Sequence, residues 1–190
     1  MIKSVCVYSS SSDAVDDLFF RAAKELGGAI ANAGYTLVYG GSNIGLMGAV
    51  AKSVHEQNGT VIGVIPAAIA DQGIGYNLAD ELVITDTLRE RKQIMEQRSD
   101  AFVALPGGFG TLEELLEIIT LKQLHYHNKA IMLLNIHDFY RPLTDLFEHL
   151  FSHRFAKADS RNAYDVCGDI PKLMTRLETY KPPDLKEKWF

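Results

Sequence analysis

The sequence predicts an α/β fold: a Rossmann-like, doubly wound parallel sheet with helices on both faces. Two observations carry this prediction. Short apolar runs alternate with longer segments of helical periodicity along most of the chain, and the runs are too continuous to leave one face of a strand in water. Strands of this kind, separated by helices, are typical of parallel sheets that are covered on both sides.

Apolar runs define the predicted strands at residues 4–8, 36–39, 61–65, 101–105 and 130–134. Helical periodicity fills the intervals between them. The first helix should end at Gly34, because glycine commonly terminates a helix. The predicted helices cover residues 13–33, 45–58, 88–98, 111–124, 140–154 and 170–180.

The chain is long enough for one ordinary domain, which we expect to cover residues 1–180. Residues 181–190, KPPDLKEKWF, combine prolines with charged side chains and are predicted to be a C-terminal tail. No internal repeat or linker interrupts the domain.

Composition narrows the class of protein. A formal net charge of −5 argues against a nucleic-acid-binding surface. Cys6 and Cys167 lie far apart and have no metal-ligand spacing, which fits a reducing compartment. No stretch approaches the roughly 20 apolar residues of a membrane span, and the N-terminus lacks the pattern of a signal peptide. We therefore expect a soluble cytoplasmic protein.

The first glycine-rich loop, YGGSNIGLMG at residues 39–48, follows a predicted strand and leads into a helix. Gly41 and Gly45 are its candidate ligand-binding residues, because glycine lets the backbone approach a phosphate at a helix N-terminus. The alternative is a tight strand-to-helix turn with no ligand.

The second loop, LPGGFGT at residues 105–111, has the same context. Gly107, Gly108, Gly110 and Thr111 are its candidate phosphate ligands. Neither loop is a Walker A sequence or a dinucleotide fingerprint. Because ligands of such sheets bind beyond the carboxyl ends of the strands, two converging loops indicate a compact phosphorylated ligand.

Glu114 follows the second loop by one helical turn. Its alternative role is structural, since Thr111 and Glu114 have the spacing of a capping box. Glu113 and Glu117 share a separate acidic face. Capping alone does not require the glycines, so Glu114 is predicted to be a functional carboxylate turned toward the loop.

A cationic partner for Glu114 is predicted in the helix over residues 88–98. Arg91 interrupts its apolar stripe, whereas Arg89 and Lys92 lie beside that stripe. An arginine on a core-facing stripe normally has a buried anionic partner. The stripe consists of Leu88, Arg91, Ile94, Met95 and Arg98.

These motifs together resemble the LOG family of cytokinin riboside 5′-monophosphate phosphoribohydrolases. The resemblance runs from about residue 5 to residue 150 and rests on PGGFGTLEE, the Arg91–Lys92 pair, GGSNIGLMG and VIGVIP. It implies hydrolysis of the N-glycosidic bond of an N6-substituted adenosine 5′-monophosphate to free base and ribose 5-phosphate. It also implies a homodimer and no cofactor.

The resemblance assigns roles to particular residues. Gly107, Gly108, Gly110 and Thr111 match the phosphate-binding turn of the family. By the same match, Glu114 is the essential glutamate, Arg91 the essential arginine and Lys92 its neighbour in substrate binding, and Thr120 is a further substrate contact. A hydroxyl bond from Thr120 to the preceding helical turn is the alternative.

Departures from the family pattern leave the preferred base open. Ser9–Ser12 replace C-G-S-S, Ser42 replaces a glycine, and Leu88-Arg89 replaces Met-His. Residues 67–80, which commonly form part of the base pocket in the family, diverge most. Alternatives are therefore a general AMP nucleosidase, a non-catalytic nucleotide sensor, and a phosphate-ester hydrolase that would need a magnesium-binding carboxylate cluster.

No metal site is predicted. His149 and His153 lie four residues apart on a predicted helix, but no third ligand accompanies them. The expected partners are thus a nucleoside monophosphate and a second copy of the chain, without nucleic acid or membrane.

Overall fold

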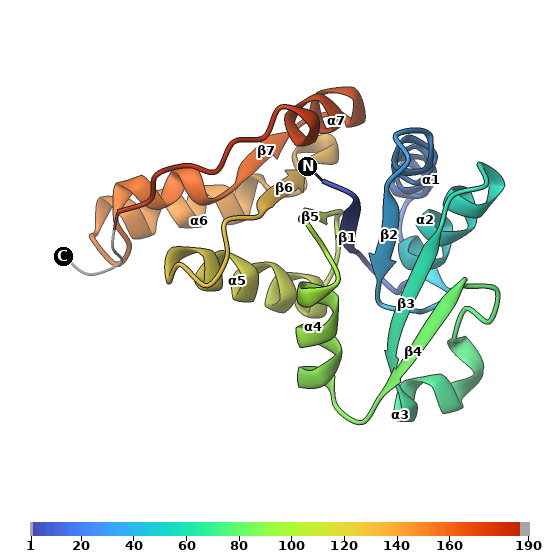
Figure 1. Ribbon diagram of the computed structural model, residues 1–190. Coiled ribbons are helices and arrows are strands. Elements are labelled where there is room, and N and C mark those ends of the chain that lie inside the picture. The colour runs from blue at the N-terminus through green and yellow to red at the C-terminus, as the bar shows by residue number, and fades with distance from the viewer. Residues whose placement is uncertain (1, 187–190) are drawn as a thin grey trace.

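The computed structural model describes residues 2–186, in which seven parallel strands form one sheet in the order β4-β3-β2-β1-β5-β6-β7 (Figure 1). The last four residues of the predicted tail, 187–190, lie outside the described residues. The strands are β1 (Ser4–Tyr8), β2 (Thr36–Tyr39), β3 (Val61–Pro66), β4 (Glu81–Thr85), β5 (Ala101–Ala104), β6 (Ala130–Leu134) and β7 (Asp165–Cys167).

Helices cover both faces of the sheet, as Figure 1 shows. One face carries α1 (Asp17–Asn32), α2 (Gly45–Glu56) and α7 (Ile170–Glu178). The other carries α4 (Leu88–Gln97), α5 (Phe109–Gln123) and α6 (Arg141–Ser152). The short helical segments are α3 (Ala67–Ile69), η1 (Ala70–Ile74), η2 (Ile136–Asp138) and η3 (Ala158–Ala163).

Alternation along β1 shows why the strands read as continuous apolar runs. Val5 and Val7 point into the core beneath α1 and α2, while Cys6 and Tyr8 point into the core beneath α4, α5 and α6. Successive side chains of a strand point to opposite faces, so both sets must be apolar when both faces are covered. The predicted doubly wound fold is confirmed.

Two strands escaped the sequence analysis, and both lie at an edge of the sheet. β4 starts with the exposed Glu81 and keeps Ile84 53% exposed, so its pattern is not continuously apolar. β7 has only three residues. An edge strand has a neighbouring strand on one side only, and its side chains are covered less completely than those of a central strand. Its sequence is therefore less continuously apolar.

Helix starts differ from the predictions where side chains or glycines set them. α1 starts at Asp17 rather than residue 13, because the Asp16 carboxylate accepts the Leu18 N–H at 3.0 Å as an N-cap. α5 starts at Phe109, two residues before the predicted start.

The order of the strands places a switch point at β1. The chain builds outward from β1 through β2 and β3 to β4, then returns through α4 to β5 on the other side of β1. The loops after β1, β2 and β5 therefore diverge from neighbouring strand ends, and this is where open α/β sheets bind ligands.

Candidate active site

A cavity of about 580 Å³ opens where those loops diverge. The loop after β1 contributes Ser9 to Ser12, and the two glycine-rich loops contribute a wall each, from Gly40 to Met47 and from Gly108 to Thr111. Arg91 of α4 and Glu114 of α5 lie between these walls. The predicted convergence of the two loops is confirmed.

Arg91 and Glu114 form a buried ion pair in this cavity. The Nη1 atom of Arg91 lies 2.6 Å from Oε1 of Glu114, and their side chains are only 12% and 8% exposed. The Nε atom of Arg91 donates to the Val64 carbonyl of β3 at 3.0 Å. The expected anionic partner of Arg91 is thus present, while the catalytic roles of both residues stay predictions.

Burial and the cation act on Glu114 in opposite directions. Desolvation raises the pKa of the Glu114 carboxyl above its ordinary value, and the Arg91 guanidinium lowers it in part. The net shift is upward. A carboxyl whose proton affinity is raised in a cleft and opposed by one fixed cation is a frequent feature of catalytic sites.

The N-terminus of α5 faces the cavity with no side-chain cap. Gly108 is its N-cap residue, so Thr111 lies inside the first turn. The capping-box alternative is therefore wrong: Thr111 is not the N-cap, and Glu114 bonds to Arg91. Uncapped N–H groups and the positive end of the helix dipole suit an anion at this point.

The N-terminus of α2 is occupied instead. The Asp13 carboxylate accepts the Gly45 N–H at 2.8 Å, and the Ser10 carbonyl accepts the Met47 N–H at 3.3 Å. Gly41 and Gly45 have φ angles of +74° and +58° and do not line the cavity. Gly41 and Gly45 therefore serve the conformation of the turn. This loop forms part of the cavity wall, but its helix N-terminus is not open to an anion.

Of the other predicted site residues, Gly108, Gly110 and Thr111 line the cavity, whereas Gly107, Lys92 and Thr120 do not. Lys92 binds Glu113 and, at 2.9 Å, Glu117, which ties α4 to the acidic face of α5. Thr120 is exposed and donates its hydroxyl to the Leu116 carbonyl at 2.8 Å, which is the back-bonding alternative.

Residues 47–177 match the protein family described as "Possible lysine decarboxylase". The chain is also 38% identical to cytokinin riboside 5′-monophosphate phosphoribohydrolase LOG5 of Arabidopsis thaliana, over 98% of this chain and 84% of that protein. The chain belongs to the LOG family. A rice relative, cytokinin riboside 5′-monophosphate phosphoribohydrolase LOG of Oryza sativa, is 39% identical over 95% of this chain and 74% of its own length.

Solved structures share this LOG-family fold at lower identity. The molybdenum cofactor carrier protein of Chlamydomonas reinhardtii superposes with a TM-score of 0.73 at 22% identity, covering 94% of this chain and 97% of that one. The molybdenum cofactor binding protein of Rippkaea orientalis gives a TM-score of 0.74 at 21% identity, with the same coverage. These likenesses concern the fold alone.

The divergent stretch of this LOG-family chain supplies one wall of the cavity. Ile69, Gln72 and Ile74, on α3 and η1, line it together with Ile44 and Met47. The resemblance placed part of the base pocket in this stretch, but the residues themselves carry no motif that would single them out. Asp13 was also missed, because its bond to Gly45 spans 32 residues.

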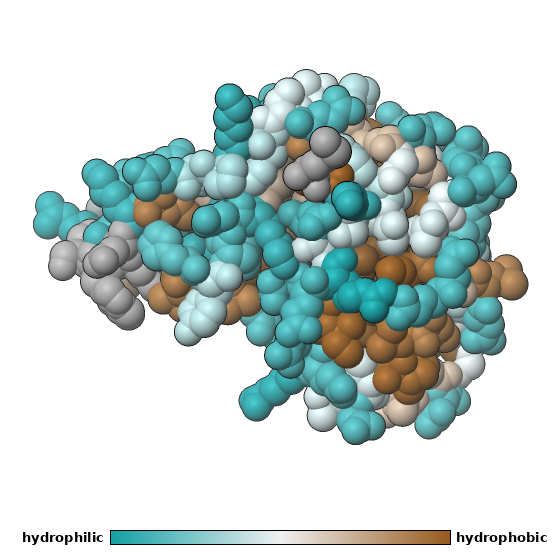
Figure 2. Space-filling model, viewed as in Figure 1, coloured by the Kyte–Doolittle hydropathy of each residue, from teal (hydrophilic) through white to brown (hydrophobic). Residues whose placement is uncertain are grey.

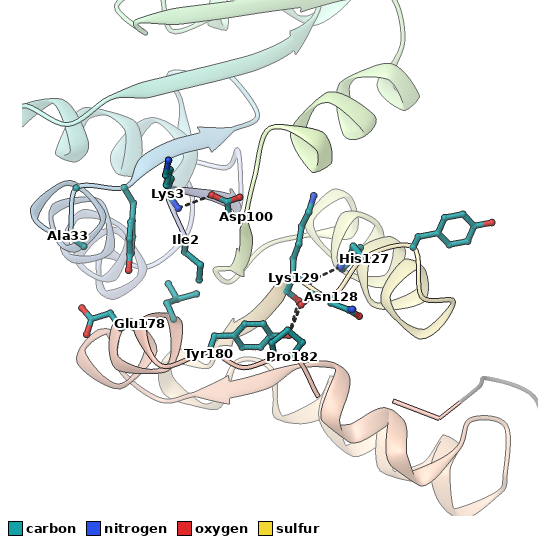
Figure 3. Close-up of a pocket in the computed structure, with 14 residues that line it drawn as sticks. Ile2, Lys3, Ala33, Asp100, His127, Asn128, Lys129, Glu178, Tyr180 and Pro182 are labelled. Carbon is teal, nitrogen blue, oxygen red and sulfur yellow. Dashed lines mark hydrogen bonds between the residues drawn. The ribbon is translucent and has the colours of Figure 1, made fainter. Parts of the chain in front are cut away.

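A larger cavity, of about 930 Å³, lies at the opposite ends of the strands (Figure 3). Its side chains already have partners in the fold: Asp100 accepts the Lys3 N–H at 2.8 Å, and the Lys129 ammonium lies 2.8 Å from Glu96. Tyr180 donates to the Asn128 carbonyl at 3.0 Å. Arg91 and Glu114 do not line this cavity.

Among residues 2–186, no group of three or more His, Cys, Asp and Glu side chains has the arrangement of a metal site. Within the same part of the chain, no helix is long and apolar enough to cross a membrane.

Proposed function

We propose that this protein is an N-glycosyl hydrolase that converts an N6-substituted adenosine 5′-monophosphate to the free base and ribose 5-phosphate. The observation that carries the proposal is the buried Arg91–Glu114 pair beside the uncapped N-terminus of α5. The activity for which the relatives are named, phosphoribohydrolysis of cytokinin riboside 5′-monophosphates, is the same chemistry.

The substrate phosphate binds at the N-terminus of α5, where Gly108, Gly110 and Thr111 present the backbone. Fixing the phosphate there holds the ribose in register with Glu114, so that binding is converted into orientation. The α2 end of the cavity receives no phosphate, because Asp13 already occupies it.

Glu114 acts on the reacting carbon. As the bond between C1′ and the base nitrogen breaks, its electron pair leaves with the base, which takes up a proton, and positive charge develops on the ribose. The Glu114 carboxylate stabilises that charge and orients the water whose oxygen bonds to C1′. Arg91 holds the carboxylate in place and keeps it ionised against the cost of burial.

The opposite wall suits the base. Ile44, Met47, Ile69 and Ile74 form an apolar surface, on which a purine and an aliphatic N6 substituent lose water favourably. The older family description as a lysine decarboxylase fits less well. Of the described residues that line the cavity none is a lysine, the residue on which pyridoxal phosphate would form its Schiff base.

A three-substrate chromatographic assay tests the proposal. Isopentenyladenosine 5′-monophosphate, AMP and isopentenyladenosine are each incubated with the protein, and free base is quantified. We expect base from the modified monophosphate and little from the riboside, which lacks the phosphate. Equal or faster release from AMP would make the protein a general AMP nucleosidase, and binding without any release would make it a sensor.

We also propose that the protein is a homodimer. Figure 2 shows apolar side chains gathered over the region of α4, β3 and β4. Ile84 and Leu88, from these elements, are 53% and 57% exposed, and Phe109 at the mouth of the cavity is 93% exposed. Apolar surface concentrated in this way is typical of a protein–protein interface.

We further propose a cytoplasmic location, since Cys6 and Cys167 are both free thiols.

A further inference from the structure

Arg91 is held at three points, and only two of them are hydrogen bonds. Its Nε atom donates to Val64 of β3 and its Nη1 atom to Glu114 of α5. Its Nη2 atom lies against the backbone of Gly40, the first residue after β2. A methyl group at position 40 would come within 2.2 Å of Nη2 and 2.8 Å of the Met47 sulfur.

Backbone conformation does not explain this glycine. Gly40 is not among the residues with positive φ, so alanine meets no strain there. Its neighbour Gly41 differs, because its φ is +74° and an added methyl group would lie 3.3 Å from the backbone of Val64. At position 40 the obstacles are the far ends of two flexible side chains, Arg91 and Met47, and Arg91 is the nearer. Both would give way while the backbone stays in place.

We propose that Gly40 is a positioning residue for the glycosidic cleavage described above, because the missing side chain lets the Arg91 guanidinium pass beneath the β2–α2 loop and seat against Glu114. The inference rests on the proposed function. Gly40 itself lines the cavity, and its part in the inference is to leave room for the Arg91 guanidinium.

The effect on the pKa of Glu114 distinguishes a positioning role of Gly40 from a role in packing alone. Arg91 is the main group that lowers the pKa of the Glu114 carboxyl against burial, while Glu113 raises that pKa and Lys92 lowers it to a smaller extent. If a side chain at position 40 moves the guanidinium away, that pKa rises further. The acidic limb of the pH–rate profile then shifts to higher pH, which a loss of stability alone would not produce.

The test compares wild type, Gly40→Ala, Arg91→Ala and the double variant, with free base released from isopentenyladenosine 5′-monophosphate measured across the pH range. We expect Gly40→Ala to lower kcat/KM at least about tenfold and to move the acidic limb upward. In the Arg91→Ala background the same change should cost less than about twofold, because Arg91 is gone and only the end of the Met47 side chain still has to shift. Equal losses in both backgrounds, or an unmoved acidic limb, would overturn the inference.

Gly28→Ala serves as the matched control. Gly28 lies inside α1, and an added methyl group there would make only ordinary contacts, at 3.8 Å and 3.9 Å. Its kcat/KM should stay at the wild-type value; an equal loss there would show that glycine-to-alanine changes act generally, and would overturn the inference.

The inference about Gly40 can also be tested if the proposed function fails. If the wild-type protein releases no base, urea unfolding of the same four proteins measures the coupling between positions 40 and 91 directly. Non-additive losses of stability would support the seating of Arg91 by Gly40. Additive losses would overturn it.

Discussion

The ion pair between Glu114 and Arg91 holds both side chains in position. The carboxylate is 8% exposed, and a buried charge without a partner is costly, so neither side chain is replaceable without disturbing the other. The Val64 carbonyl accepts a hydrogen bond from the guanidinium, and the backbone of Gly40 lies against it. A chemical group held from several elements in this way is preorganised for its task.

Substitution of either residue should remove turnover while the fold persists. Glu114→Gln and Arg91→Ala are each expected to lower kcat at least about a hundredfold, because one removes the charge facing the ribose and the other its support. Base release with isopentenyladenosine 5′-monophosphate measures this. Glu25→Gln, on the exposed side of α1, should leave the rate unchanged. Near-wild-type rates in folded Glu114→Gln would remove Glu114 from the mechanism.

The pH dependence follows from burial of the same carboxyl. Desolvation raises the pKa of Glu114, and cleavage needs the ionised form. Activity is therefore present above that raised pKa and is lost as the pH falls through it. We expect the acidic limb of kcat/KM to lie above the ordinary glutamate value of about 4.3. A profile that stays flat down to that value would contradict the assignment.

The two helix N-termini at the cavity are the main feature at the scale of elements. α5 has no side-chain cap, whereas α2 receives the carboxylate of Asp13 from the loop after β1. The glycine-rich sequences before them look alike, yet one leads to a helix end without a side-chain cap and the other to a helix end that already binds Asp13. Lys92 then joins α4 to α5 through Glu113 and Glu117, which keeps Arg91 opposite Glu114.

Asp13 should contribute stability rather than chemistry. Asp13→Ala removes the acceptor of the Gly45 N–H and is expected to cost about 0.5–2 kcal/mol of unfolding free energy, as for helix caps in general. Asp13→Asn keeps an acceptor oxygen and should lie close to wild type. Urea unfolding of the two variants checks this difference, and equal stabilities would rule out a capping role.

Sequence patterns predicted the buried strands and the main helices because both depend on local periodicity. The edge strands β4 and β7 were missed, since half-exposed or three-residue strands have no such signal. Arg91 and Glu114 were identifiable because a charge interrupts an apolar stripe and a carboxylate follows a glycine loop. Asp13 was not, because its bond to Gly45 joins two loops that only the folded chain brings together.

At the scale of the whole molecule, the doubly wound sheet has the cavity with Arg91 and Glu114 at the carboxyl ends of its strands and a cavity of about 930 Å³ at the opposite ends. The loops after β1, β2 and β5 meet at the switch point, so residues from distant parts of the chain share one site. The apolar surface near α4 lies close to the cavity with Arg91, because Leu88 precedes Arg91 by one turn on the same helix.

Charge placed on this surface should dissociate the proposed dimer. Leu88→Arg puts a cation where an apolar contact is expected, and light scattering should then report a monomer mass. Leu146→Arg on α6 is the matched control, since Leu146 is 51% exposed and Leu88 is 57% exposed. A monomeric wild type would contradict the proposed dimer. Dissociation by Leu146→Arg alone would place the interface on α6.

The Asp13 carboxylate binds the N-terminus of α2, where a phosphate would otherwise bind. Dinucleotides and nucleoside diphosphates carry more than one phosphate, whereas this cavity leaves one helix end open and fills the other from its own chain. A second phosphate brought to α2 would meet a fixed negative charge in place of free N–H groups. We therefore expect the cavity to bind a monophosphate and to disfavour a ligand with a second phosphate.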